Sequence, residues 1–176
     1  PPGGLSGDPS SGHTGLYVYG YNLAGPYSNG MSEAYLTTTA IDCSNIEGTT
    51  LVFWRWLGVE DADYDEAAVQ VSNDGSTWTT VWHNPSSPGY INTLDDHWQL
   101  CVYDISDVAD GESTVYIRWQ MGPTDPVAIQ YAGWNIDDIE IWNGPPLPIL
   151  AWMAYADTTT GGEYEQTMQA LEEAMG

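Results

Sequence analysis

The segment Ala132–Trp142, "AGWNIDDIEIW", decides how the fold is read. It is rich in β-branched and aromatic residues, which strands favour, and we expect it to form the closing strand of the domain. The alternation that a half-buried strand requires is nevertheless broken. Ile136 and Ile139 are three residues apart, whereas Ile139 and Ile141 are two apart. Something must interrupt the regular pleat in the middle of this strand.

Two adjacent carboxylates, Asp137 and Asp138, occupy the interruption. They are consistent with a β-bulge, in which an extra residue re-aims a side chain and the carboxylates accept hydrogen bonds that fasten the strand. They are also consistent with a calcium site, because hard oxygen ligands on a bent backbone suit Ca²⁺ and a dication neutralises two neighbouring charges. Both interpretations remain open from these residues alone.

Short β-type runs separated by turn residues precede the closing strand. The hairpin "AAVQVSNDGSTWTTVW" is the clearest, with an Asn-Asp-Gly turn between two alternating runs. With no helical pattern between the runs, the sequence predicts an all-β fold, a two-sheet antiparallel jelly-roll sandwich over residues 1–143. The expected strands are Leu16–Tyr21, Ala34–Ile41, Thr50–Leu57, Ala67–Ser72, Thr77–Trp82, Trp98–Asp104, Thr114–Met121 and Trp134–Trp142.

Residues 144–176 differ in character from the sandwich. A Pro-rich linker leads into an apolar run, predicted to be a strand, and then into a segment with apolar residues at helical spacing. This C-terminal strand-plus-helix extension cannot form a domain alone, so we expect it to pack on its own sandwich, on a neighbour or on a further domain. The candidate assembly residues are Ile149, Leu150, Trp152, Tyr164, Met168 and Leu171.

The charge balance of the 176-residue chain is strongly acidic. Lysine is absent, Arg55 and Arg118 are the two arginines, and the formal net charge is −23. Such a surface repels phosphate backbones, so we expect no nucleic-acid partner. No apolar run reaches the length of a membrane span, so we expect no membrane insertion. The chain opens without an initiator Met, which we interpret as a processed protein or a piece of a longer one.

The sequence favours a protein that is not an enzyme. His13, His83 and His97 lack metal-ligand spacing, and no nucleophile elbow occurs. Cys43 and Cys101 lie in no electropositive context that would activate a thiol, and they could be either a disulfide or two buried thiols. Carboxylates are so abundant that a paired-carboxylate mechanism cannot be read from them.

A second acidic cluster lies between two predicted strands. Asp61, Asp63 and Asp65 alternate as the first ligands of an EF-hand do, and they are flanked by Glu60 and Glu66. The glycine and terminal glutamate of an EF-hand loop are missing, so a loose cation site and a solvated loop are both consistent with the pattern. Other acidic positions, including Asp125, are interpreted as solvated turns.

Several of these stretches together resemble a known group of modules. "GWNIDDIEIW", "VYIRWQMGPTD", "VQVSNDGSTWTTVW" and "YLTTTAIDCS" are similar to the jelly-roll modules of secreted bacterial proteins. These are the cleaved-adhesin domains of gingipain-type proteases and the C-terminal modules of immune-inhibitor-A-type metallopeptidases, with MAM domains more distant. The resemblance implies a secreted or cell-surface location, bound Ca²⁺ and a non-catalytic role. It suggests Asp8 in the first loop, and less strongly Asn22, as calcium ligands beside Asp137 and Asp138.

Two functions follow as expectations. The first is adhesion or assembly through contacts with further copies or with another cell-surface protein, in which the apolar tail completes a neighbour's sheet edge. The alternative is a carbohydrate-binding accessory module of a larger secreted hydrolase or protease, with polysaccharide as partner. Candidate ligand-binding residues are Arg55, Arg118, Tyr27 and Trp98.

Overall fold

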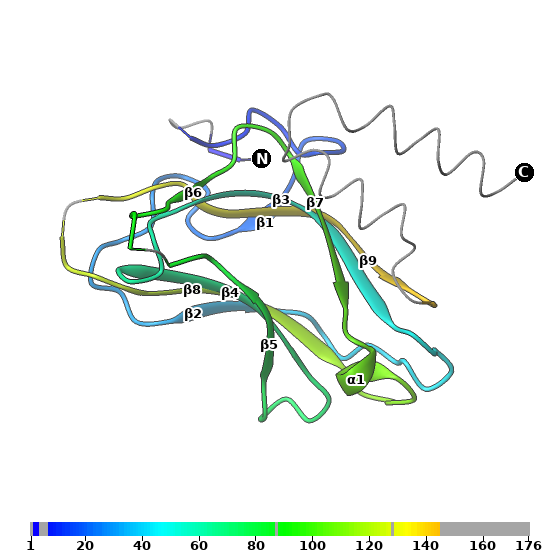
Figure 1. Ribbon diagram of the computed structural model, residues 1–176. Coiled ribbons are helices and arrows are strands. Elements are labelled where there is room, and N and C mark those ends of the chain that lie inside the picture. The colour runs from blue at the N-terminus through cyan, green and yellow to red at the C-terminus, as the bar shows by residue number, and fades with distance from the viewer. Residues whose placement is uncertain (1, 4–6, 87, 128, 145–176) are drawn as a thin grey trace, which may run out of the picture.

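The computed structural model describes residues 2–3, 7–86, 88–127 and 129–144. Two antiparallel sheets lie one above the other (Figure 1), which confirms the predicted β-sandwich. A cluster of buried hydrophobic side chains fills the space between them. The assembly residues predicted at Ile149, Leu150, Trp152, Tyr164, Met168 and Leu171 lie outside the described part of the chain.

The first sheet has five strands and is built around one central pair. It contains β1 (Tyr19–Gly20), β3 (Thr50–Val59), β6 (Thr93–Leu94), β7 (Gln99–Asp104) and β9 (Gly133–Trp142). The strand order is β1-β9-β3, and both β6 and β7 pair with the other side of β3. The β3–β9 ladder is the longest in this sheet and runs from Thr50↔Trp142 to Gly58↔Gly133.

The second sheet has four strands in the order β2-β8-β4-β5. They are β2 (Ala34–Thr37), β4 (Asp65–Ser72), β5 (Thr79–His83) and β8 (Tyr116–Thr124). A four-residue helix, α1 (Ser106–Ala109), lies between β7 and β8. All eight predicted strands are present with shifted ends. β6 and α1 were not predicted, because two and four residues are too few to produce a periodic pattern.

The broken alternation in β9 is a β-bulge. Val52 of β3 pairs with Glu140 and Trp54 pairs with Asp137, so that Asp138 and Ile139 together oppose Phe53. Asp138 has a φ of +47°, a left-handed conformation that Asp tolerates better than most residues. The extra residue restores the inward register, so that Ile139 packs against the same core as Ile136. The bulge interpretation of the two aspartates is therefore confirmed.

Aromatic rings fill the centre between the sheets. Phe53 meets Trp119 edge-to-face with ring centroids 5.3 Å apart, and Trp134 meets Trp82 at 5.6 Å. The indole nitrogen of Trp134 donates to the carbonyl of Gln120 at 2.7 Å, which ties β9 to the second sheet. Cys43 and Cys101 are both buried free thiols. No helix among the described residues has the length and apolar character needed to cross a membrane.

Shortening Phe53 should measure how much this aromatic centre contributes to stability. Phe53 is fully buried, so we expect Phe53→Ala to lower the free energy of unfolding by about 3–5 kcal/mol through lost burial and a residual cavity. Urea unfolding followed by tryptophan fluorescence measures the change. Leu94→Ala is the control, because Leu94 is 53% exposed and its truncation should leave stability nearly unchanged. Equal losses in both variants would contradict this account of the core.

Candidate functional site: a carboxylate triad at the strand ends

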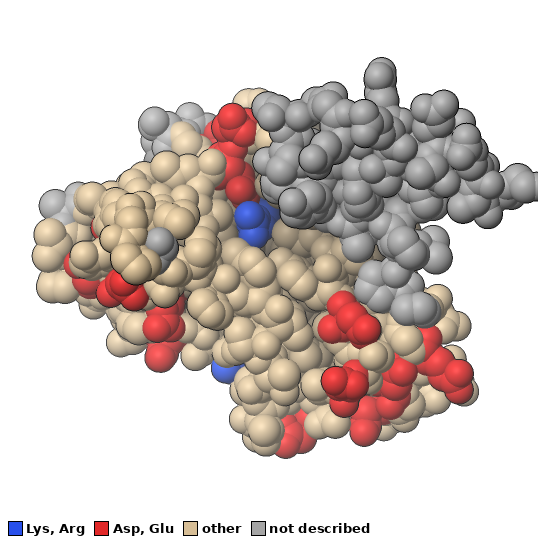
Figure 2. Space-filling model, viewed as in Figure 1, with Lys and Arg blue, Asp and Glu red and all other residues tan. Residues whose placement is uncertain are grey.

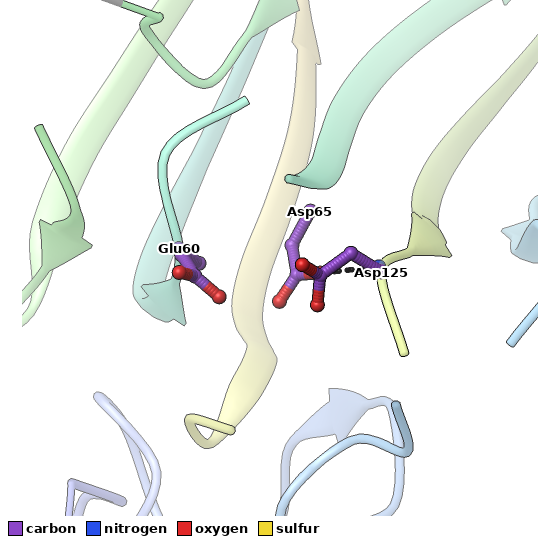
Figure 3. A group of neighbouring side chains, drawn as sticks. All are labelled: Glu60, Asp65 and Asp125. Carbon is purple, nitrogen blue, oxygen red and sulfur yellow. Dashed lines mark hydrogen bonds between the residues drawn. The ribbon is translucent and has the colours of Figure 1, made fainter. Parts of the chain in front are cut away.

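Three carboxylates meet where three strands end or begin. Glu60 follows the last residue of β3, Asp65 is the first residue of β4, and Asp125 follows the last residue of β8. Ligand oxygens from the three side chains lie within 4.8 Å of one another, close enough to hold a metal ion. Figure 3 shows the three side chains pointing toward a common centre from separate strand ends.

Asp65 is fixed by its neighbours on both carboxylate oxygens. Tyr27, from the loop after β1, donates its hydroxyl proton to Asp65 Oδ2 at 2.6 Å, and the backbone N–H of Asp125 donates to Asp65 Oδ1 at 2.9 Å. Both Tyr27 and Asp65 are fully buried. Burial, followed by the hydrogen bond and negative charge of Asp65, raises the pKa of Tyr27 far above its usual range, so this tyrosine stays a donor.

The loop that carries Glu60 and Asp65 is held by Asn84. The side-chain N–H groups of this buried residue donate to the carbonyl oxygens of Glu60 and Asp65 at 2.8 and 2.9 Å. Its side-chain oxygen accepts from the backbone N–H of Ala67 at 2.8 Å. These bonds fix the backbone from which the side chains of Glu60 and Asp65 extend.

Glu60 is the member of the triad whose charge is least compensated. Its side chain is 4% exposed, and Tyr90 donates a short hydrogen bond to Oε1. Oε2 is buried and has no hydrogen-bond partner among the described residues. Burial raises the pKa of Glu60, and the charges of Asp65 and Asp125 raise it further against the lowering effect of Tyr90. A buried carboxylate oxygen left without a donor costs free energy that a cation would offset.

The chemistry of this donor set fits a hard cation. All the groups around the centre offer oxygen, and neither histidine nor cysteine belongs to the cluster, so zinc and the soft metals are poorly matched. The triad can hold a metal ion through three carboxylates. Figure 2 shows the wider setting, in which acidic side chains form several separate patches on a face of mostly uncharged residues and basic side chains appear at two small places.

The predicted acidic cluster contributed only part of this site. Asp65 belongs to the triad, but Asp61 and Asp63 do not. The carboxylate of Asp61 is buried and accepts the backbone N–H groups of Ile91 and Asp63, so its role here is to order the loop, while the side chain of Asp63 is exposed. Interpreting Asp125 as a solvated turn was wrong, because β8 brings it to Asp65 from 60 residues away.

Three of the other predicted metal residues, Asp8, Asp137 and Asp138, lie on or beside β9. The N-terminal loop packs there, as expected, but its contacts with Asp137 and Asp138 are hydrogen bonds. Asp138 pairs with His13 Nδ1 at 2.7 Å and accepts from Thr14 Oγ1 at 2.6 Å, and Asp137 accepts from the backbone N–H of Thr14 at 3.2 Å. In the described residues Asp8, Asp137 and Asp138 do not form a three-carboxylate group.

Gly12 allows this loop to approach the strand so closely. A Cβ at this position would come within 2.7 Å of Asp137 Oδ2 and 2.6 Å of the carbonyl oxygen of Thr14. The ring of His13 then stacks on Trp54, with centroids 3.8 Å apart. Residues His13 and Thr14 of the N-terminal loop are therefore fastened to the bulge and its partner strand by three hydrogen bonds and one ring stack.

Asp8 lies against β9, and Asn22 has a different role. Asn135 donates its side-chain N–H to Asp8 Oδ1 at 3.0 Å. Asp8 Oδ2 and Asn135 Oδ1 are buried acceptors without partners among the described residues. Asn22 is an exposed turn residue with a φ of +44°, and its side chain donates to the carbonyl of Pro26. Asn22 therefore orders its own turn.

The predicted ligand-binding residues are dispersed over the molecule. Arg55 points between the sheets, pairs with Asp95 at 2.9 Å and lies over Trp82, so it is a structural cation. Tyr27 is fully buried, donates a hydrogen bond to Asp65 of the triad and is not on a binding surface. Trp98 lies edge-on to Trp56 beneath the N-terminal loop, and Arg118 is on the outer face of the four-stranded sheet.

Comparisons with known proteins give similar solved structures but no family. No protein-family model matches the chain, and a search of curated proteins gives no match. Among solved structures, the chain is similar to TmCBM61, a carbohydrate-binding module, in complex with β-1,4-galactotriose. The two are 16% identical, with a TM-score of 0.43, and the match covers 76% of this chain and 75% of that one.

Replacing Asp138 with Asn tests how the N-terminal loop is fastened. Burial acts to raise the pKa of Asp138, but the hydrogen bonds from His13 and Thr14 and the charge of His13 outweigh it and lower the pKa. We expect Asp138→Asn to lower the free energy of unfolding by about 1–2 kcal/mol near neutral pH. The difference from wild type should vanish as pH falls through the lowered pKa, where the wild-type carboxyl is also neutral. Urea unfolding over a pH series measures it.

Asp96→Asn is the matched control for that substitution. Asp96 also pairs with a histidine, His97 at 2.6 Å, but its side chain is 91% exposed. An exposed pair of this kind contributes little to stability, so the control should be indistinguishable from wild type. If Asp138→Asn behaved like the control, the contacts of the loop with the bulge would not contribute to folding.

Proposed function

We propose that the protein is a non-catalytic β-sandwich that binds Ca²⁺ at Glu60, Asp65 and Asp125 and serves outside the cell in adhesion or assembly. One observation carries the proposal: the buried, unpartnered Oε2 of Glu60 faces two further carboxylates at the strand ends. The extracellular setting is supported by the resemblance to secreted jelly-roll modules.

Calcium is the cation favoured by the way the triad is built. Ca²⁺ accepts six to eight oxygen ligands in irregular geometry, whereas Mg²⁺ demands an octahedron and usually keeps several of its waters. Glu60 and Asp65 are buried and held by Tyr90, Tyr27 and the loop contacts of Asn84, which leaves little freedom to form an octahedron. Backbone carbonyls and water can supply the remaining ligands of a larger, less regular shell.

A cation at this position would act on the whole sandwich. It would join the end of β3 in one sheet to the start of β4 and the end of β8 in the other. It would also neutralise carboxylates that repel one another in a chain of net charge −23. A rigid, stabilised sandwich is what an adhesion or assembly module requires, because its binding surfaces lie on strands and short loops.

Calcium should raise the melting temperature of the wild-type protein. Mass action predicts about 2.7 kcal/mol of stabilisation at a hundredfold excess over Kd, or about 5–10 °C for a domain of this size. Glu60→Gln removes the uncompensated charge and should abolish most of that shift. Thermal unfolding by circular dichroism, in calcium and in chelator, measures both, and calorimetric titration with CaCl₂ counts the ions.

Asp63→Asn provides the matched control for Glu60→Gln. It removes one negative charge from the same loop, but the side chain of Asp63 is exposed and lies outside the triad. This variant should keep the full calcium response. Equal responses from Glu60→Gln and Asp63→Asn would mean that calcium only screens surface charge, and a wild-type protein unaffected by calcium would refute the site.

A second candidate function, binding of a carbohydrate, is favoured by the outer face of the four-stranded sheet. The guanidinium of Arg118 lies 3.9 Å from the ring centroids of both Tyr35 and Trp78. Its Nε donates to Gln70 Oε1 at 2.6 Å, and the amide of Gln70 donates to Thr80 at 3.1 Å.

A shallow cavity of about 340 Å³ adjoins this network. Gln70 and Thr80 line it together with Glu66, His83 and Gln120. Fixed amide and hydroxyl groups beside aromatic rings suit the hydroxyl-rich, partly apolar surface of a sugar. Tyr35 and Trp78, which were not among the predicted ligand-binding residues, would supply the stacking surface in place of Tyr27 and Trp98.

Trp78→Ala tests the carbohydrate candidate. Loss of one stacking ring should weaken binding to a polysaccharide roughly tenfold, because aromatic contacts contribute about 0.5–1.5 kcal/mol beyond their buried area. Affinity electrophoresis in gels containing neutral galactans or glucans measures the change. Trp142→Ala, on the other sheet and 36% exposed, should migrate like wild type. If no polysaccharide retards the wild type or the control, this face is not a sugar site.

A further inference from the structure

The sandwich is open along the flank where β1 and β2 are the edge strands. The two residues of β1 pair only with Asn135 and Ile136 of β9. From Asp137 to Trp142, β9 pairs with β3 on one side and with no described strand on the other. The four-residue β2 is the edge of the opposite sheet. Unpaired edges therefore face one another across the flank.

An apolar groove follows these edges between the sheets. We call it the flank groove; it has a volume of about 440 Å³ and is lined by Tyr19, Leu36, Ile41, Trp119, Ile139 and the threonines at 37–39. A cavity of about 140 Å³ continues it inward along Leu36 and Trp119. The lining contains no charged side chain, which is unusual on a protein so rich in carboxylates.

Trp119 places an unpaired hydrogen-bond donor at the flank groove. This tryptophan lines both the groove and its inner continuation and is only 2% exposed. Its indole Nε1–H is buried and has no acceptor among the described residues. A buried donor left unpaired costs free energy, so an occupant that brings a carbonyl oxygen would be favoured over one that is purely apolar.

An extended polypeptide satisfies all three features of the groove. Its backbone can pair with an open sheet edge, alternate side chains can enter an apolar groove, and its carbonyls can accept a hydrogen bond. The chain itself contains such a segment in Ile149–Ala156, "ILAWMAYA", among the 32 residues that follow Gly144. It carries no charge, so it can approach this acidic protein without repulsion.

We propose that the flank groove binds Ile149–Ala156 of a second copy of this chain. The connecting sequence favours a neighbour, because it contains Pro145, Pro146 and Pro148. Pro-rich chain is extended and stiff, at about 3.1 Å per residue, and resists the tight reversal that pairing with its own β9 requires. The proposal rests on the assembly role proposed above but not on the calcium site. Repetition of the contact links copies head to tail.

Directed cross-linking identifies both the occupant and its origin. One full-length variant carries Ile139→Cys and a second carries Leu150→Cys; the two are mixed under mild oxidation and separated on denaturing gels. We expect a cross-linked species of twice the 19.3 kDa chain mass that contains one copy of each. In the control mixture, Leu94→Cys takes the place of Ile139→Cys. Because Leu94 is exposed on β6, away from the groove, the yield of the cross-linked species should fall at least about tenfold.

The outcomes separate the groove from the broader assembly role. If a single chain carrying both Ile139→Cys and Leu150→Cys cross-links internally at high dilution, the segment occupies its own groove and the proposal is overturned. If wild type forms oligomers in sedimentation but the Ile139→Cys and Leu150→Cys mixture cross-links no better than the Leu94→Cys control, the groove proposal alone is overturned. Wild type that stays monomeric at every concentration would overturn assembly as well, while the calcium-dependent melting shift would still report on the triad.

Discussion

The pairing of β9 with β3 is the contact on which the other features depend. Its bulge at Asp138 keeps Ile136 and Ile139 on the core side while turning two carboxylates toward the N-terminal loop. The same ladder begins at Gly133 near the triad and ends at Trp142, where the flank opens. One irregularity in one strand thus sets the core register, the anchor of the first loop and the unpaired edge of the sheet.

A chain with 25 acidic residues must accommodate carboxylates in buried positions as well as on its surface. At the bulge, His13 and Thr14 hydrogen-bond to the carboxylates of Asp137 and Asp138 and fasten the loop. At the triad, Asp65 accepts from Tyr27 and from the backbone N–H of Asp125, Glu60 accepts from Tyr90, and Asp125 accepts from the backbone N–H of Val127. Glu60 Oε2 is left buried with no donor among the described residues. This difference in hydrogen-bond supply distinguishes the two acidic sites.

Local pattern was sufficient to predict most of the fold. The alternation around Val69 and the Asn-Asp-Gly turn gave the β4–β5 hairpin, and the isoleucine spacing in the closing strand indicated the bulge. The triad could not be found in this way. Asp125 looks like any turn residue until β8 and β4 pair and bring it to Asp65, and the exposure of Asp63 depends on how its loop turns. The role of Tyr35 likewise depends on Arg118 lying between it and Trp78.

The separation of the sites explains how one small sandwich could combine them. The triad is at the end of β3 that carries Val59, whereas the open edge of β9 lies toward Thr50 at the other end of the same strand. The outer face of the four-stranded sheet is a third, independent surface. A cation bound at the triad would therefore stabilise the sheets without covering either surface. Calcium would then control how rigidly these surfaces are presented, and their own side chains would determine what they bind.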